Sequence, residues 1–172
     1  MRLIALLISA VLVVIDQILK IAVNNNMTPY LESGESISVI KFGNKEIFNL
    51  TYYLNDGAGW SILEGKTLLL VGFTSILLVV AIIYMLKFAE KNKLIISALS
   101  CIIGGGIGNL LDRVFRNGNV IDFIDARFID FPIFNFADIC VTVGVALFII
   151  YIIKSEIKIK KTTSTERENT NG

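Results

Sequence analysis

Two aspartates border apolar segments of this chain and could act together as acid–base groups. Asp122 lies within the run Val120-Ile121-Asp122-Phe123, and Asp138 follows Phe136 and Ala137. A charged side chain at the centre of a membrane helix costs roughly 2.5–3.5 kcal/mol on insertion scales, so membrane proteins rarely keep one without a function. Two such carboxylates near the ends of apolar segments therefore indicate chemistry performed by a carboxyl pair.

The spacing of the acidic residues leaves the composition of the pair open. Asp125 and Asp130 lie close enough in the chain to compete as partners. Asp138 also fits an ordinary role at the start of a helix, where the helix dipole stabilises a carboxylate slightly. Asp122 also fits an ordinary loop charge. The residues alone therefore leave Asp125 in particular as an alternative partner.

The composition indicates an integral membrane protein. Hydrophobic residues make up 54% of the 172 positions, against roughly 45–50% in soluble domains even when glycine is counted. The net charge of +1 gives no basic surface for nucleic acid, so we expect no nucleic-acid partner. Histidine, the commonest metal ligand and general base, is absent, and we expect no metal. Cys101 and Cys140 lie in apolar runs and are expected to pack as free, small apolar side chains.

Four stretches are long and apolar enough to cross about 30 Å of hydrocarbon. They comprise approximately residues 3–23, 67–86, 94–111 and 136–153. The first does not fit a cleaved signal peptide, because Asp16 and Lys20 interrupt it and no cleavage site follows. We therefore expect an α-helical membrane protein with four transmembrane helices in one domain, residues 1–161. Residues 162–172 are polar and without pattern, and we expect them to form a disordered cytoplasmic tail.

The distribution of basic residues predicts that both termini lie in the cytoplasm, because cytoplasmic flanks of membrane helices are enriched in Lys and Arg. The flanking basic residues on that side are Arg2, Lys87, Lys91, Lys93, Lys154, Lys158, Lys160 and Lys161. Residues 24–66 and 112–135 then face outward. Three arginines in the second of these loops weaken the argument without reversing it.

Residues 36–54, between the first and second spans, predict a small extracytoplasmic β-sheet. They are rich in β-branched and aromatic residues and flank Gly43-Asn44, a turn sequence. A solvated loop is the alternative, and the high apolar content disfavours it. Aromatic rings favour the headgroup zone of a membrane. The aromatic residues expected there are Tyr30, Phe42, Phe48, Tyr52, Tyr53 and Trp60.

Two further polar groups lie near the outer ends of the spans. Asp16 and Lys20 are four residues apart with the acid first, the favoured order for an intrahelical pair. They could simply neutralise each other or could also line a polar pocket. Asn109, Asp112 and Arg113 share one helix face, and an arginine there could hold a carboxylate in a two-pronged grip. We favour a cluster that supports a site over a simple ion pair at the helix end.

Five motifs, in this order, resemble those of bacterial lipoprotein signal peptidase, the type II signal peptidase. They are Asp16-x-x-x-Lys20, Asn55-x-Gly57-Ala58, Gly104-Gly105-x-x-Gly108-Asn109-x-x-Asp112-Arg113, Gly118-x-Val120-x-Asp122-Phe123 and Phe134-Asn135-x-Ala137-Asp138. The resemblance extends from the first span to the fourth and leaves out only the tail. One departure is Gly59-Trp60, where the family more often has Ala-Phe, and we expect altered local packing there.

The resemblance implies a membrane aspartic endopeptidase, active at the extracytoplasmic face of the bacterial cytoplasmic membrane. Such an enzyme removes signal peptides from diacylglyceryl-modified prolipoproteins by cleaving before the lipidated cysteine. Asp122 and Asp138 would form its catalytic dyad. Residues expected to bind substrate or support the site are Asp16, Lys20, Asn55, Gly57, Asn109, Asp112, Arg113 and Asn135.

The same resemblance implies the partners of the protein. They would be a lipid-modified prolipoprotein, membrane lipids and globomycin-type inhibitors, and we expect a monomer without a cofactor. The alternative is a small proton or ion transporter that relays charge through intramembrane Asp and Lys residues. A relay needs such groups throughout the membrane depth, whereas here they gather at the outer end and the second span has none.

Overall fold

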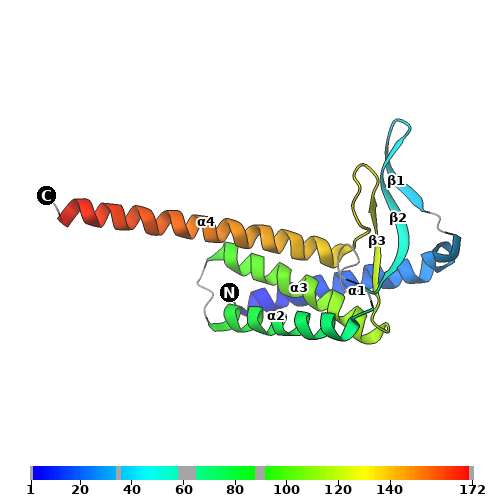
Figure 1. The fold of residues 1–172 in the computed structure, drawn as a ribbon, viewed down its shortest axis with the longest axis horizontal. Helices are drawn as coiled ribbons and strands as arrows, with labels where there is room; N and C mark the ends of the chain where they lie inside the picture. Colours follow the sequence, from blue (N-terminus) through cyan, green and yellow to red (C-terminus); the bar gives the residue numbers. More distant parts are fainter. Residues whose placement is uncertain (1, 34–35, 58–64, 88–91, 171–172) are drawn as a thin grey trace.

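A computed structural model describes residues 2–33, 36–57, 65–87 and 92–170. Its elements are α1 (Arg2–Ser33), β1 (Ile37–Phe42), β2 (Lys45–Asn55), α2 (Thr67–Lys87), α3 (Lys93–Phe115), β3 (Val120–Ala126) and α4 (Phe136–Thr170). The helices lie side by side, and the sheet stands across one end of the bundle, away from both termini (Figure 1).

Four helices in the described residues are long and apolar enough to span a membrane, as the sequence predicts. Their apolar portions are Arg2–Met27, Thr67–Lys87, Lys93–Phe115 and Phe136–Lys158. Many large apolar side chains on their outer faces are exposed, Leu68 by 87% among them, because lipid tails would cover these faces. The protein is therefore a multi-pass α-helical membrane protein.

Helix α3 lies at the centre of the bundle and packs closely on α1 and α4. Half of the residues in its most apolar stretch are buried, against 17–22% in the corresponding stretches of the other spans. Glycines permit the close packing. A Cβ at Gly104 would lie 2.9 Å from Leu12 Cβ, and one at Gly144 would lie 2.8 Å from the backbone oxygen of Ala98. The glycines of the third span thus serve helix packing.

The expected hairpin is present and gains a third strand. Strands β1 and β2 pair in antiparallel fashion around the turn at Gly43, whose φ of +60° suits glycine. Strand β3 then pairs with β2, with Tyr53 opposite Asp122, which gives the order β1-β2-β3. The sequence predicts residues 112–135 as a loop between two spans, and two aspartates do interrupt the apolar pattern of β3. Both acids have partners in the fold, so the strand forms around them.

A small apolar cluster joins the sheet to the C-terminal part of α1. Met27, Tyr52, Ile121 and Phe123 pack together and are buried, and the Tyr52 hydroxyl donates to Asn24 Oδ1 at 2.7 Å. Tyr52 therefore belongs to the interior and not to the surface where we expected it. The side chain of Tyr30 and all of Trp60 lie outside the described part of the chain.

Helix α4 is longer than expected. It continues to Thr170, whereas we expected a disordered tail from residue 162. Extending a helix that is already formed costs little per residue, and residues 145–171 contain no Gly or Pro. In Figure 1 this end of α4 extends well beyond the other helices.

Candidate active site

The structure brings Asp122 and Asp138 together at the sheet end of the bundle. Asp122 lies on β3, and Asp138 lies in the first turn of α4. Asn135 bridges them: its Nδ2 donates to Asp122 Oδ1 at 2.6 Å, and its backbone N–H donates to Asp138 Oδ2 at 3.0 Å. Both aspartates line one cavity of about 190 Å³. The pair favoured from the sequence therefore faces a common space.

The start of α4 fixes the orientation of Asp138. Its backbone N–H donates to Asn135 Oδ1 at 3.0 Å, while its carboxylate accepts the backbone N–H of Asn135. This reciprocal pair is a capping box, which satisfies N–H groups that the helix itself cannot. Asp138 thus has the helix-start role considered above, and its second oxygen still faces the site.

Neutral amides hold all four carboxylate oxygens of the pair. Asn55 Nδ2 donates to Asp122 Oδ2 at 2.8 Å, and Asn109 Nδ2 donates to Asp138 Oδ1 at 2.7 Å. Asn135 serves the remaining two oxygens. An amide donor fixes a carboxylate in place without supplying a full positive charge to neutralise it. The two acids are therefore positioned while their mutual repulsion remains.

This environment changes the proton affinity of Asp122. Burial raises its pKa from 3.8 to about 7, and the negative charge of Asp138 acts in the same direction. The hydrogen bonds from Asn55 and Asn135 and the charge of Lys20 oppose the rise. A carboxyl group with this pKa is roughly half protonated at pH 7. Asp122 can thus act as a proton donor near neutral pH.

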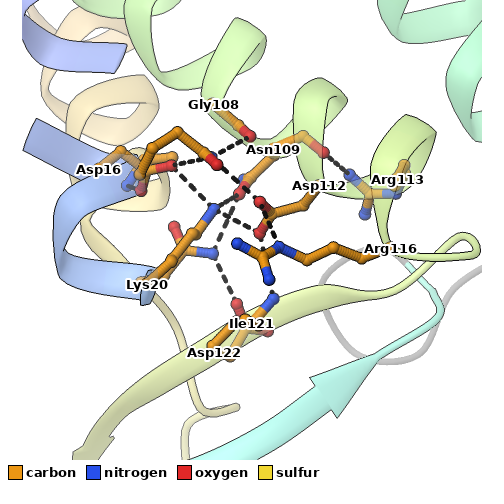
Figure 2. A network of polar contacts seen from close by, with 12 residues as sticks. Asp16, Lys20, Gly108, Asn109, Asp112, Arg113, Arg116, Ile121 and Asp122 are labelled. Carbon is orange, nitrogen blue, oxygen red and sulfur yellow. Dashed lines mark hydrogen bonds and ion pairs between the residues drawn. The ribbon is translucent and has the colours of Figure 1, made fainter. Parts of the chain in front are cut away.

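A buried ionic cluster lies close to Asp122 (Figure 2). Lys20 Nζ lies 2.9 Å from Asp16 Oδ2 and 3.0 Å from Asp112 Oδ2, and it donates to Asn109 Oδ1 at 2.8 Å. All three charged side chains are at most 1% exposed. Burial of ions is tolerable only when they are paired. The Asp16–Lys20 pair expected from the spacing is therefore present, and Asp112 joins it.

Arg113 differs from the expectation that it grips a carboxylate. Its guanidinium donates to the backbone oxygen of Gly57 at 2.6 Å and to that of Asn109 at 3.5 Å. Among the described residues it forms no ion pair, and its buried Nε has no partner. Asp112 is paired by Lys20 and Arg116 instead. Arg113 consequently lines the cavity with its guanidinium bound to backbone oxygens rather than to a carboxylate.

Gly57 lies in a tight turn beside the site. Its backbone N–H donates to Asn55 Oδ1 at 2.9 Å, and its oxygen accepts from Arg113. The turn thus orients the amide that holds Asp122. The departure at Gly59-Trp60 lies outside the described residues.

Sequence reasoning missed Gln17 and Arg116. Gln17 Nε2 donates to Asp16, to Asp112 and to the backbone oxygen of Gly108. Arg116 pairs with Asp112 at 3.2 Å, and its i, i+4 spacing was a usable signal. No comparable signal marks Gln17, because its contacts to Asp112 and Gly108 depend on how α1 packs on α3.

The competing acids lie elsewhere. Asp125 forms an ion pair with Arg127 at 2.7 Å, and Asp130 is exposed. Residues three apart on a strand face opposite sides, so Asp125 points away when Asp122 points into the site. Neither lines the cavity that Asp122 and Asp138 share.

A second, apolar cavity adjoins the first. It measures about 420 Å³ and lies between α2, α3 and α4. Its apolar lining includes Leu70, Phe73, Leu77 and Ile102. Asn109, Arg113 and Asp138 line both cavities. We call the second cavity the apolar groove and the first cavity the polar cavity. Because they share three lining residues, the apolar groove between the membrane helices leads to the carboxyl pair.

The fold and the site define a multi-pass membrane protein with paired acids at one end of a four-helix bundle. The sequence profile described as Signal peptidase (SPase) II matches residues 8–154. The chain belongs to the signal peptidase II family, and it is a membrane peptidase. Membership in a peptidase family decides against the transporter alternative.

Similar proteins cover nearly the whole chain. The lipoprotein signal peptidase of Clostridium acetobutylicum is 38% identical over 156 residues, which is 89% of this chain and 96% of that protein. The lipoprotein signal peptidase of Halalkalibacterium halodurans is 38% identical over 90% of this chain and 95% of its own. That of Staphylococcus aureus MRSA252 is 37% identical over 87% and 88%.

Two solved structures share the fold. A bacterial membrane enzyme determined by the in meso method at 2.3 Å resolution superposes with a TM-score of 0.77 and 35% identity, covering 88% of each chain. A second, at 1.9 Å resolution, gives a TM-score of 0.75 and 37% identity over 87% of this chain and 92% of that one.

Proposed function

We propose that this protein is a membrane aspartic endopeptidase that removes signal peptides from diacylglyceryl-modified prolipoproteins. It would cleave just before the lipidated cysteine, as the resemblance implies. The observation that carries the aspartic mechanism is the bridge from Asn135 to both carboxyl groups within one cavity. The name of the relatives, lipoprotein signal peptidase, supports the substrate class.

The proposed reaction uses one proton held between Asp122 and Asp138. Two carboxyl groups this close cannot both ionise cheaply, so one remains protonated near neutral pH. The ionised acid takes a proton from water, and the resulting hydroxide attacks the scissile carbonyl. The protonated acid donates its proton to the developing oxyanion, which gives a tetrahedral diol. The acid that took the proton from water then donates it to the leaving amine as the carbon–nitrogen bond breaks, and the other acid regains a proton from a diol hydroxyl as the carboxyl product forms.

We assign the proton at rest to Asp122. Burial and the neighbouring charge raise its pKa to about 7. Asp138 lies at the positive end of the dipole of α4. Asp138 would then be the general base and Asp122 the general acid. The pair still titrates as a unit in any kinetic measurement.

The substrate would use both cavities. The apolar groove between α2, α3 and α4 suits the apolar part of a signal peptide or its attached lipid. The cleavage site would enter the polar cavity, where Arg113, Asn55 and Asn109 offer donors. Because the groove and the cavity share Asp138, a substrate lying in the groove would pass next to the base.

The proposed orientation has both termini in the cytoplasm and the site at the extracytoplasmic face. The sheet would then lie on the outer membrane surface and hold the substrate. Phe42 is 83% exposed at the hairpin, and Phe128 and Phe131 are also exposed, which suits the headgroup zone. The protein would be a monomer with a single domain, and globomycin-type compounds would inhibit it.

Turnover of a lipidated precursor by purified protein tests the proposal. We expect release of the signal peptide, with an N-terminal lipidated cysteine on the product detected by mass spectrometry. An unlipidated precursor of the same sequence should be cleaved much more slowly. Absence of cleavage of the lipidated precursor, by protein that is folded in detergent or nanodiscs, would contradict the proposed function.

A further inference from the structure

The residue before each member of the carboxyl pair is held by a carboxylate outside the pair. Ile121, which precedes Asp122, donates its backbone N–H to Asp112 Oδ2 at 3.2 Å. Ala137, which precedes Asp138, donates its backbone N–H to Asp16 Oδ1 at 3.0 Å. Strand β3 and helix α4 are thus each attached, at the position next to the reacting group, to one buried acid.

Lys20 connects these two attachments. Its ammonium group contacts Asp16 at 2.9 Å and Asp112 at 3.0 Å. Its third contact, to Asn109 Oδ1 at 2.8 Å, orients the amide that donates to Asp138. All three charged side chains are buried, so water does not compete for these contacts. We call Asp16, Lys20 and Asp112 the spacing triad.

The spacing triad does not reach the substrate space. The described residues that line the polar cavity and the apolar groove include none of its members. Apart from the charge of Lys20, which acts on Asp122 across space, any effect on the reaction must therefore pass through the backbone of β3 and α4 or through Asn109.

We propose that the spacing triad consists of positioning residues that fix the separation of strand β3 from helix α4 and so hold the two carboxyl groups of the dyad together. This role rests on the proposed function and adds to it a reason for a lysine buried between two acids. Both attachments use a carboxylate oxygen as an acceptor. Activity should therefore depend on whether these side chains keep an oxygen that can accept the backbone hydrogen bond, and not on their charge alone.

Replacement of Asp112 by two side chains of similar size tests this point. Asp112→Asn keeps an oxygen that can accept from Ile121, whereas Asp112→Leu has none, and both remove the same charge. Misplacement of a reacting group by about 1 Å can lower a rate by about 100-fold. We expect kcat of Asp112→Leu to fall by about 100-fold and kcat of Asp112→Asn by about tenfold or less, with KM changed by less than about threefold.

The pH profile of the same two variants reports the geometry of the dyad. Repulsion between the carboxyl groups raises the pKa at which the shared proton is lost, so separating them lowers it. We expect the alkaline limb of kcat/KM to lie at lower pH in Asp112→Leu than in Asp112→Asn. Lys20 and Arg113, the cations acting on the dyad, are kept in both variants. Equal losses with equal pH profiles, or losses in KM alone, would overturn the positioning role.

A charge-neutral pair of variants serves where Asp112→Leu fails to fold. A Cβ at Gly108 would lie 2.6 Å from Asp16 Oδ2, so Gly108→Ala should displace that carboxylate from Ala137. A Cβ at Gly72 would meet nothing within 4 Å, which makes Gly72→Ala the matched control. We expect kcat of Gly108→Ala to fall about tenfold or more relative to Gly72→Ala at similar KM.

The outcomes separate the two proposals. Cleavage of the lipidated precursor by the unmodified protein, together with equal kcat values for Gly108→Ala and Gly72→Ala, would overturn the positioning role alone. Failure of the unmodified protein to cleave that precursor would overturn the proposed function and, with it, the positioning role.

Discussion

The two sides of helix α3 pack very differently, although neighbouring glycines face them. A Cβ at Gly105 would collide with the backbone oxygen of Ala137 at the start of α4. A Cβ at Gly106 would meet the terminal methyl group of Leu78 on α2, at 2.8 Å. Backbone cannot yield, whereas a leucine side chain can change rotamer. The α3–α4 side is therefore closely fixed, and the α2–α3 side is adaptable.

The difference matches the demands of the proposed reaction. The fixed side carries Asp138, Asn135 and the attachment of β3, all of which must keep their geometry during catalysis. The adaptable side lines the apolar groove, which includes Gly106 and Leu78. A peptidase that processes many signal peptides would need room of variable shape there. Helix α3 is thus closely packed on the side that faces α4 and adaptable on the side that faces α2.

Loss of either carboxyl group on the fixed side should have the largest effect. Asp122→Asn and Asp138→Asn should each lower kcat by about 10³-fold or more, since general acid–base catalysis contributes about 10²–10⁴-fold. The change is nearly isosteric, so expression and thermal unfolding should remain close to those of the unmodified protein. Product formation from a lipidated precursor is the measurement. Substantial activity in either purified variant would mean that the replaced aspartate is not a member of the catalytic dyad.

Activity should depend on pH through the proton on Asp122. Its pKa is raised to about 7, so the protonated form predominates below that pH and is lost above it. With Asp122 as the general acid, kcat/KM should decline at higher pH, by about tenfold per unit once the proton is mostly gone. Stopped assays between pH 5 and 9 measure the profile. A rate that rises steadily through this range would mean that the proton at rest has been assigned to the wrong aspartate.

Alanine at the neighbouring glycines tests the comparison directly. Gly105→Ala forces a methyl group against backbone and should lower the stability by about 1–3 kcal/mol, the usual cost of overpacking. Its kcat should fall as well, because the start of α4 moves. Gly106→Ala should leave the unfolding temperature almost unchanged and raise KM a few-fold by narrowing the groove. A lower kcat in Gly106→Ala together with a higher KM in Gly105→Ala would mean that the two sides have exchanged roles.

The sequence predicts the parts of this site that arise from local spacing. The Asp16–Lys20 pair follows from an i, i+4 separation, and the hairpin follows from Gly43-Asn44 between apolar runs. Strand β3 could not be predicted in this way. Asp122 interrupts its pattern, and the burial of this acid is acceptable only because Asn55 and Asn135 donate hydrogen bonds to it in the fold.

The role of Arg113 escaped prediction for a similar reason. Its spacing brings it near Asp112, yet Lys20 and Arg116 occupy that carboxylate, and a backbone oxygen of the Gly57 turn attracts the guanidinium instead. Competition among donors for one acceptor depends on the arrangement of three separate elements. Pairwise spacing along the chain contains no information about which donor prevails.

Neutralisation of Asp125 or Asp130 should have the smallest effect. Asp125 pairs with Arg127, whose side chain is 49% exposed, and an exposed pair of this kind contributes at most about 1 kcal/mol. Asp125→Asn and Asp130→Asn should therefore keep kcat and KM within about threefold of the unmodified values. Asp125 is three residues from Asp122 on the same strand, so its side chain faces away from the shared cavity. A loss at Asp125 as large as that at Asp122 would mean that the strand presents its other face to the substrate, and the contrast between a fixed catalytic side and an adaptable groove would then have to be redrawn around Asp125.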